Sequence, residues 1–323
     1  MPQNKNNKIQ KPMSDNNNAS PNTSEKPSKR LVIVTGDKGG VGKSTFARGL
    51  LQLYINKDID CIAYEADQRN PQLERHFGKK YGALVHYVDI FRKGGADELL
   101  VNIEKEKDKL TFMLDLPAQS GGFFEEFIKE VSFFEMLKTI GYRVTMVSVI
   151  SRVLDSVNVL EKLHECCKDQ VDYVVVKNLF HGEEEKFERY NDSPFRQNNK
   201  DNLKEITMPD LFYKPYDFID VHGLTFNDVQ THSETNIVIK ARVRAWLNQF
   251  EEQVQPISDL FHLNNKPSPG IYKCMAKETE NRKRKEKEEQ EKLKKEEQEK
   301  LKKEQSEQAK KETPDSQLES QST

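Results

Sequence analysis

The chain has 323 residues, and its 51 basic and 53 acidic side chains give a formal net charge of −2. A near-neutral chain is not drawn to nucleic acid by its overall charge, so any contact with DNA would need a local basic patch. Its four cysteines form no C-x-x-C pair, which argues against a zinc or disulfide framework and favours reduced thiols. The sequence has no apolar stretch of about 18 residues and no apolar leader, so we expect a cytoplasmic protein.

Composition divides the chain into three parts. Residues 1–29 are rich in Asn and contain almost no large apolar side chain, and residues 273–323 are dominated by Lys, Glu and Gln. Neither part can bury enough apolar surface to offset the entropy of ordering. We therefore expect a disordered N-terminal segment, a globular domain over residues 30–272, and a charged tail that is helical or disordered.

The charged tail contains an internal repeat, because the eight residues 288–295 recur unchanged at 296–303. The repeat places Glu four residues before Lys, a spacing that stabilises a solvated single helix. Leu293 and Leu301 are eight residues apart and do not form a heptad seam. A charged spacer helix is the simplest interpretation, and a partner-binding arm is the alternative.

Between residues 30 and 254, short apolar runs alternate with stretches of helical periodicity. The predicted strands are 31–34, 59–64, 110–114, 143–150, 171–176 and one near Ile206. The predicted helices are 43–54, 71–77, 123–139, 153–168 and 233–254. This alternation predicts βαβ units, and hence an α/β domain with a mostly parallel sheet between helices. Residues 78–109, which include a charged helix predicted near 96–107, interrupt the pattern, and we interpret them as an insertion or a lid beside the nucleotide site.

A glycine-rich segment, Gly36 to Thr45, lies between the first predicted strand and the first predicted helix. Successive backbone N–H groups in such a loop can surround phosphate oxygens, and the helix N-terminus adds the positive end of its dipole. Lys43 would contact the β- and γ-phosphates, the Ser44 hydroxyl would bind Mg²⁺, and Thr45 would meet the α-phosphate. A glycine-rich turn without a ligand is the alternative. The predicted nucleotide-binding residues of this loop are Asp37, Gly39, Gly40, Val41, Gly42, Lys43, Ser44 and Thr45.

The segment Lys38-Gly-Gly-Val-Gly-Lys-Ser44 resembles the deviant Walker A motif of the ParA/MinD family of ATPases. The resemblance implies a three-layer P-loop NTPase domain that uses ATP and Mg²⁺. It also implies an ATP-dependent homodimer, in which Lys38 reaches the phosphates bound by the partner, much as an arginine finger does. Asp37 stands where the general phosphate-loop pattern has its first glycine, a position at which members of this family vary.

Further motifs follow in the order that the family has. Glu65-Ala-Asp67 ends a predicted strand and resembles the D-x-D segment called switch I, so Asp67 would position the attacking water or a Mg²⁺-bound water. Asp115 resembles the Walker B aspartate, and Asp115-Leu-Pro-Ala-Gln119 resembles the opening of switch II. Asn178 and Pro209 resemble the residues that contact the adenine and stack on it. The implied catalytic residues are Lys38, Lys43, Asp67 and Asp115, and the implied metal-binding residues are Ser44, Asp67 and Asp115.

The leading functional hypothesis is an ATPase of plasmid partition or mobilisation. The Pro-Ala-Gln sequence of switch II is most similar to that of ParA-type proteins associated with plasmid mobilisation and conjugation. Such an ATPase would dimerise with Mg-ATP and hydrolyse it slowly, with DNA or a DNA-bound partition or relaxase protein as its partner. Lys240, Arg242 and Arg244 are candidate phosphate contacts, and a solvated helix face is the simpler interpretation of these three residues.

Two alternatives stay open. A MinD-like ATPase at a membrane surface would need an amphipathic C-terminal helix, and the two leucines of the tail repeat make stable membrane association unexpected. A nucleotide-binding regulator without significant turnover would carry the same phosphate loop. The redox branch of the family is disfavoured, because Cys61, Cys166 and Cys167 do not lie beside the switch segments. The absence of an N-K-x-D sequence favours adenine over guanine.

Overall fold

The structure is a computed structural model that describes residues 29–36 and 38–311. The predicted disordered segment before Lys29 and the phosphate-contacting role of Asp37 therefore lie outside the described residues. Within them, seven strands form one sheet in the order β3-β2-β4-β1-β5-β6-β7, and every strand pair is parallel. The strands are β1 Lys29–Thr35, β2 Cys61–Glu65, β3 Val85–Tyr87, β4 Thr111–Asp115, β5 Tyr142–Ile150, β6 Val171–Asn178 and β7 Leu203–Met208.

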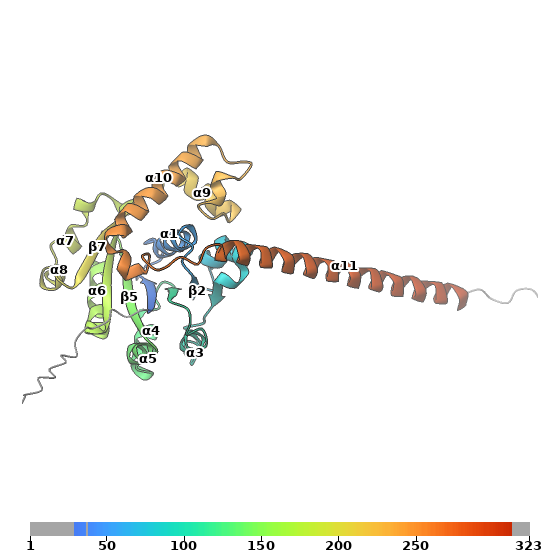
Figure 1. The fold of residues 1–323 in the computed structure, drawn as a ribbon, viewed down its shortest axis with the longest axis horizontal. Coiled ribbons are helices and arrows are strands. Elements are labelled where there is room, and N and C mark those ends of the chain that lie inside the picture. The colour runs from blue at the N-terminus through green and yellow to red at the C-terminus, as the bar shows by residue number, and fades with distance from the viewer. Residues whose placement is uncertain (1–28, 37, 312–323) are drawn as a thin grey trace, which may run out of the picture.

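Helices cover both faces of this sheet (Figure 1). The predicted α/β class, with a parallel sheet between two helical layers, is confirmed. The longer helices are α1 Lys43–Asn56, α3 Asp97–Lys105, α4 Gly121–Glu130, α5 Phe133–Thr139, α6 Leu154–Cys167, α9 Tyr213–His222, α10 Ile237–Val254 and α11 Ile271–Lys311. Shorter elements that matter below are the π-helix η1 Glu74–Gly78, α2 Lys79–Tyr81, η2 Gly82–Leu84, α7 Glu188–Asn191, α8 Pro194–Asn199, η6 Asp228–Gln230 and η7 Gln255–Phe261.

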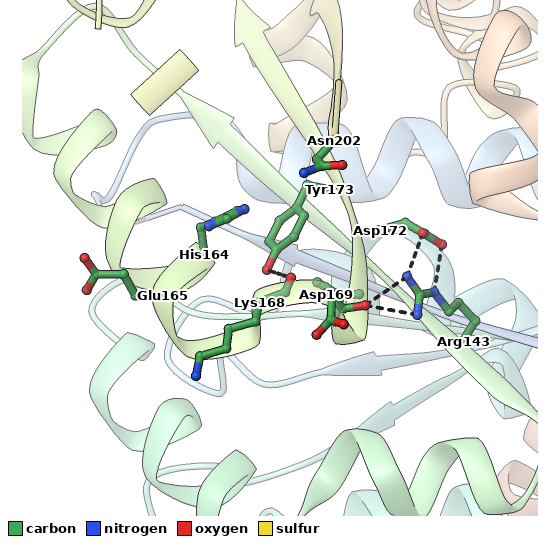
Figure 2. Close-up of a pocket in the computed structure, with 9 residues that line it drawn as sticks. Arg143, His164, Glu165, Lys168, Asp169, Asp172, Tyr173 and Asn202 are labelled. Carbon is green, nitrogen blue, oxygen red and sulfur yellow. Dashed lines mark hydrogen bonds and ion pairs between the residues drawn. The ribbon is translucent and has the colours of Figure 1, made fainter. Parts of the chain in front are cut away.

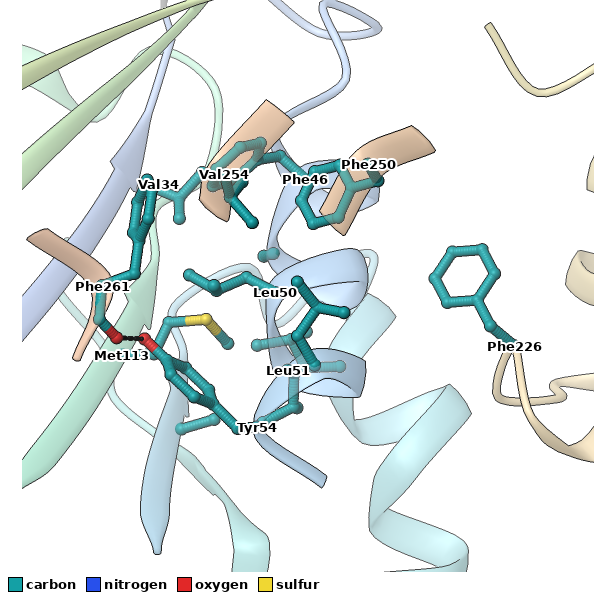
Figure 3. Close-up of a cluster of buried hydrophobic side chains, with 14 of the residues drawn as sticks. Val34, Phe46, Leu50, Leu51, Tyr54, Met113, Phe226, Phe250, Val254 and Phe261 are labelled. Atoms are coloured by element: carbon teal, nitrogen blue, oxygen red, sulfur yellow. Dashed lines mark hydrogen bonds between the residues drawn. The ribbon is translucent and has the colours of Figure 1, made fainter. Parts of the chain in front are cut away.

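The sheet separates two hydrophobic cores, because successive strand residues point to opposite faces. Val32 and Val34 of β1 belong to the core that α1 and α10 cover, while Leu31 and Ile33 belong to the core under α3 to α6. In the first core, Phe46 of α1 packs edge-on against a ring of α10, and neighbouring side chains of α1 fill the space above β1 and β4 (Figure 3). Each fully buried side chain of this size contributes about 1.5–3 kcal/mol. The helix that follows the phosphate loop is therefore firmly fixed to the sheet.

The observed elements differ from the prediction in three places. The predicted helix over 123–139 is two helices, because Ser132 adopts a left-handed backbone (φ 49°) between α4 and α5. Residues 78–109 are not a separate lid: they supply the edge strand β3 and the helix α3, whose Leu99 and Ile103 are buried in the second core. Helix α9 was not predicted, because its residues show only a weak helical pattern.

The charged tail is anchored to the domain by the first turns of α11. The Tyr272 hydroxyl donates a hydrogen bond to the Ile59 carbonyl at 2.6 Å, and Thr279 is buried against Gly82. Beyond this base the helix projects away from the domain (Figure 1), and both Leu293 and Leu301 are exposed. Across the residues that the structure describes, no helix is both long and apolar enough to cross a membrane.

Candidate nucleotide-binding site

The carboxyl ends of β1, β2 and β4 bring the predicted site segments to one edge of the sheet. Strand β1 leads into the glycine-rich loop, and α1 begins at Lys43. Val34 and Glu65, near the ends of β1 and β2, both lie in register with Asp115 at the end of β4. Open parallel sheets bind their ligands outside the carboxyl ends of the strands. The phosphate loop, the switch I segment and Asp115 thus lie where such a sheet would hold a nucleotide.

Close packing at the two ends of the loop requires glycine there, and Gly40 between them has a left-handed backbone (φ 80°). Gly42, the N-cap of α1, has φ 104°, and a Cβ placed there would collide with the side-chain amide of Asn178. A Cβ at Gly36 would lie 2.7 Å from the Val149 carbonyl oxygen. Gly39 and Gly40 have open space around them and are exposed. The loop is thus packed tightly at both ends, while its middle faces outward.

The start of α1 offers several groups to an anion. Its N-cap makes no side-chain hydrogen bond, so the first backbone N–H groups of α1 are not capped by a side chain. Lys43 is 7% exposed, and its ammonium donates a hydrogen bond to the Lys38 carbonyl at 3.1 Å. Ser44 and Thr45 are partly buried in the first turn. Backbone amides, a lysine and two hydroxyls at a helix N-terminus are a suitable cradle for phosphate oxygens.

Asp115 is the most unusual side chain of the site. It is 1% exposed, and neither carboxylate oxygen has a hydrogen-bond partner. Burial raises the pKa of Asp115 to about 7, and the neighbouring Ser44 hydroxyl and Lys43 ammonium partly offset that rise. A buried carboxylate that Ser44 and Lys43 compensate only in part is costly, so a cation beside it would be favoured.

The donors at this edge fit Mg²⁺, which prefers carboxylate and hydroxyl oxygens together with water and phosphate. Ser44 and Asp115 are the side chains placed to contribute. No group of three or more His, Cys, Asp or Glu side chains suited to a metal ion occurs in residues 29–36 and 38–311. A divalent cation here would therefore depend on nucleotide phosphates and water for the rest of its ligands.

Hydrogen bonds between residues of the switch I segment itself hold this segment in one conformation. The Asp67 carboxylate accepts hydrogen bonds from the backbone N–H groups of Arg69 and Asn70, at 3.1 and 3.0 Å. Glu65, which is fully buried, accepts from Asp67 N and from Leu73 N. Burial and the nearby Asp115 raise the pKa of Glu65, whereas the hydrogen bonds from the Leu73 and Asp67 backbone N–H groups oppose that rise. Asp67 thus lies on a short loop with defined geometry, which follows the carboxyl end of β2.

The two predicted adenine contacts, Asn178 and Pro209, lie at the carboxyl ends of β6 and β7. Asn178 is buried; its Nδ2 donates to the Val41 carbonyl at 2.8 Å and its Oδ1 accepts from Phe180 N at 3.1 Å. This side chain therefore braces the phosphate loop, and one N–H and one lone pair are left for a base. The Pro209 carbonyl accepts a hydrogen bond from the Trp246 indole at 2.7 Å, which fixes the loop after β7 to α10.

Lys38 lies on the outer face of the phosphate loop. Its ammonium pairs with the Asp155 carboxylate of the same chain, with Nζ and Oδ2 2.5 Å apart, and the two side chains are about half exposed. Asp155 lies in the first turn of α6, which follows the carboxyl end of β5. Exposed ion pairs of this kind contribute only about 0–1 kcal/mol. The lysine is therefore free to exchange this partner for a stronger one.

Sequence reasoning missed a buried cation beneath the loop. Arg48 is 1% exposed and donates to His76 Nε2 at 2.6 Å, while His76 Nδ1 donates to the Leu224 carbonyl at 2.8 Å. Burial and the neighbouring Arg48 lower the pKa of His76 to about 3, so the ring is neutral and can accept. Arg48 follows Ser44 by four residues and shares its helix face, which is the one signal that could have revealed it.

The three candidate DNA contacts do not form a single patch. Residues two apart in a helix point roughly 200° apart, so Arg242 points away from Lys240 and Arg244. The Arg242 guanidinium lies 4.5 Å from the centre of the Phe212 ring, and Arg244 donates to Gln230 Oε1 at 3.0 Å. The side chains of Arg242 and Arg244 thus already make contacts within the same chain.

A surface hollow lies at the opposite, amino edge of the sheet. It is lined from the starts of β5 and β6, and it contains Arg143, which is held by Asp172 and the Asp169 carbonyl (Figure 2). The Tyr173 hydroxyl is also engaged, with the Lys168 carbonyl. Because its polar groups pair with one another and it lies far from the phosphate loop in the fold, we assign it no role in nucleotide binding.

Comparison with known proteins gives one relative at the level of sequence. MobD of Acidithiobacillus ferrooxidans is 22% identical over 230 residues, which cover 71% of this chain and 98% of MobD. No protein-family model matches the chain.

Two solved structures share parts of the fold. A nucleotide-binding protein from Archaeoglobus fulgidus in complex with ADP is 17% identical, with a TM-score of 0.37, over 61% of this chain and 88% of that protein. The MinD cell division protein of Aquifex aeolicus is 15% identical, with a TM-score of 0.39, over 67% of this chain and 96% of that protein. The chain is therefore similar to MobD along nearly the whole of that protein, and it carries a glycine-rich loop at the carboxyl edge of a parallel sheet.

Proposed function

We propose that the protein is a Mg²⁺-dependent ATPase that dimerises when it binds ATP. The observation that carries the proposal is the buried, unpartnered carboxylate of Asp115 beside the phosphate loop. Lys43, Ser44 and the loop amides bind the phosphates, and Asp115 holds the cation through water. Asp67 positions the water that attacks the γ-phosphate, which leaves as inorganic phosphate while ADP remains.

Dimerisation is supported by what the same edge of the sheet exposes. Large apolar side chains are 43–65% exposed in the loops and first helical turns that follow β3, β4, β5 and β6, although apolar residues are usually buried. A second copy that met this edge would cover them and would bring its own Lys38 to the bound phosphates. These exposed residues are Phe91, Phe123, Val153, Leu154 and Phe180.

Size-exclusion chromatography with light scattering tests the dimer directly. With ATP and Mg²⁺, we expect the wild type to shift from monomer to dimer and Lys38→Ala to stay monomeric, because the variant lacks the cation delivered across the interface. Lys57→Ala is the matched control: Lys57 is also ion-paired, to Glu251 at 2.6 Å, but lies at the far end of α1. It should dimerise like the wild type. A wild type that remains monomeric under all nucleotide conditions contradicts the proposed dimer.

For the biological role, we propose partition or mobilisation of a plasmid, with DNA or a DNA-bound partition or relaxase protein as the partner. The similarity to MobD and the Pro-Ala-Gln spelling after Asp115 support this role. A regulator that binds ATP without turnover is the second candidate, because the same loop serves both. No observation favours a MinD-like membrane role, since α11 exposes only Leu293 and Leu301 as large apolar side chains among its described residues.

A further inference from the structure

Glu65 is a buried carboxylate at the edge of the site. It ends β2 in register with Asp115 and is fully buried. In the sequence it stands where the D-x-D pattern has its first aspartate. Buried carboxylates require hydrogen-bond donors to offset the loss of water, so the donors to Glu65 show what it does.

The two oxygens of Glu65 hold the two ends of the switch I loop. Oε1 accepts from the Asp67 backbone N–H at 3.2 Å, and Oε2 accepts from the Leu73 backbone N–H at 2.8 Å. Between these two amides, the Asp67 carboxylate accepts from Arg69 N and Asn70 N. Both ends of the loop from Asp67 to Leu73 are thus hydrogen-bonded to the Glu65 side chain.

The far end of this loop continues into a rigid frame. Leu73 is followed at once by the π-helix η1, which carries Arg75 and His76. Arg75 pairs with Asp220 of α9, and His76 bonds both Arg48 of the phosphate-loop helix and the Leu224 carbonyl. Glu65 therefore ties the start of switch I to a segment whose position is fixed by α1 and α9.

We propose that Glu65 is a positioning residue that sets the place of Asp67 opposite the phosphate loop without itself contacting the nucleotide. A Glu side chain, one methylene longer than Asp, extends past the end of β2 and reaches both amides. The role rests on the proposed ATPase function, in which Asp67 orients the attacking water. The two hydrogen bonds join protein groups only, so the tether itself can be tested without ATP.

The test uses the full-length chain with Glu65→Gln, which keeps the side-chain length but turns an NH₂ group toward one of the two amides. We expect hydrogen exchange at the amides of Asp67 and Leu73 to quicken roughly tenfold or more in the absence of nucleotide. We expect kcat to fall about 10- to 100-fold, because a misplaced catalytic group costs rate, while the Kd for ATP changes by less than about threefold. Glu205→Gln is the control: Glu205 is a largely buried carboxylate of β7 that pairs with Arg196 and Lys177.

Three results would overturn the positioning role. One is unchanged exchange at the Asp67 and Leu73 amides in Glu65→Gln. The others are a parallel loss of ATP affinity and kcat, and a similar split in Glu205→Gln, either of which would indicate general destabilisation. A wild type that binds ATP but releases no phosphate is a different outcome: it contradicts the proposed ATPase function, whereas exchange that quickens only in Glu65→Gln would still establish the tether.

Discussion

Asp115→Asn is expected to raise the melting temperature of the nucleotide-free protein at pH 8 while it abolishes Mg²⁺-dependent phosphate release. Burial penalises the ionised aspartate more than the neighbouring Ser44 and Lys43 stabilise it, so the charge destabilises the fold, whereas a neutral amide of the same shape avoids that penalty. The gain should be on the order of 2–4 kcal/mol, or roughly 5–10 °C for a domain of this size. Differential scanning calorimetry and a phosphate-release assay measure the two effects.

The pH dependence of this stabilisation has a defined sign. The pKa of Asp115 is raised from 3.8 to about 7 in the folded state, so the folded state binds this proton more tightly than the unfolded state. In the wild type, the loss of folding free energy caused by the ionised Asp115 is absent below pH 4, grows as the pH rises from 4 to 7, and is complete above pH 7. The difference in melting temperature between variant and wild type should follow the same window.

Asp172→Asn is the matched control with the opposite sign. Burial would raise the pKa of Asp172, but hydrogen bonds from Arg143 and Arg30 outweigh it and lower the pKa. Its replacement should therefore lower the melting temperature at pH 8. If Asp115→Asn were also destabilising at pH 8, the carboxylate would have a donor in solution, and the argument for a cation site would lose its basis.

Gly42→Ala is expected to weaken ATP binding by tenfold or more. The backbone at Gly42 has φ 104°, and a Cβ there would overlap the Asn178 amide, which is also the group that braces Val41. A left-handed conformation alone costs a non-glycine residue about 1–2 kcal/mol, and the loop must also move away from Asn178. Isothermal titration calorimetry with ATP and Mg²⁺ gives the affinity.

Gly39→Ala separates this effect from a general loss of flexibility. A Cβ at Gly39 meets no atom within 4 Å, and its backbone is not left-handed. The melting temperature of the Gly39→Ala variant should stay within about 1 °C of the wild type, whereas that of Gly42→Ala should fall. Equal melting temperatures for the two variants would show that the Gly42 conformation is not required by the fold.

The parts of the structure that could be predicted from sequence are those with a local cause. The buried strands appear as β-branched runs such as Leu31–Val34, and the phosphate loop appears as closely spaced glycines before Lys43. Both signals occupy a few consecutive residues, and both elements are found at those places in the structure. The break at Ser132 was missed because a single left-handed residue leaves the apolar periodicity on either side intact.

Contacts between distant segments could not be predicted in the same way. The bond from Asn178 to Val41 joins residues 137 positions apart, and it depends on how β6 lies beside the loop. The pairing of Lys38 with Asp155 and of Arg48 with His76 likewise depends on packing. The sequence therefore indicated that Glu65 lies beside the site but not what it does. Its two hydrogen-bond donors, the backbone N–H groups of Asp67 and Leu73, suggest a positioning role.

Phosphate release from ATP by the purified wild type and by Lys43→Ala tests the central claim most directly. Lys43 is 7% exposed at the start of α1, where its ammonium is placed to meet the phosphates. We expect slow, Mg²⁺-dependent release by the wild type and a rate lower by about 100-fold or more in Lys43→Ala. A wild type that binds ATP without releasing phosphate, or a Lys43→Ala variant as active as the wild type, would contradict the proposed ATPase.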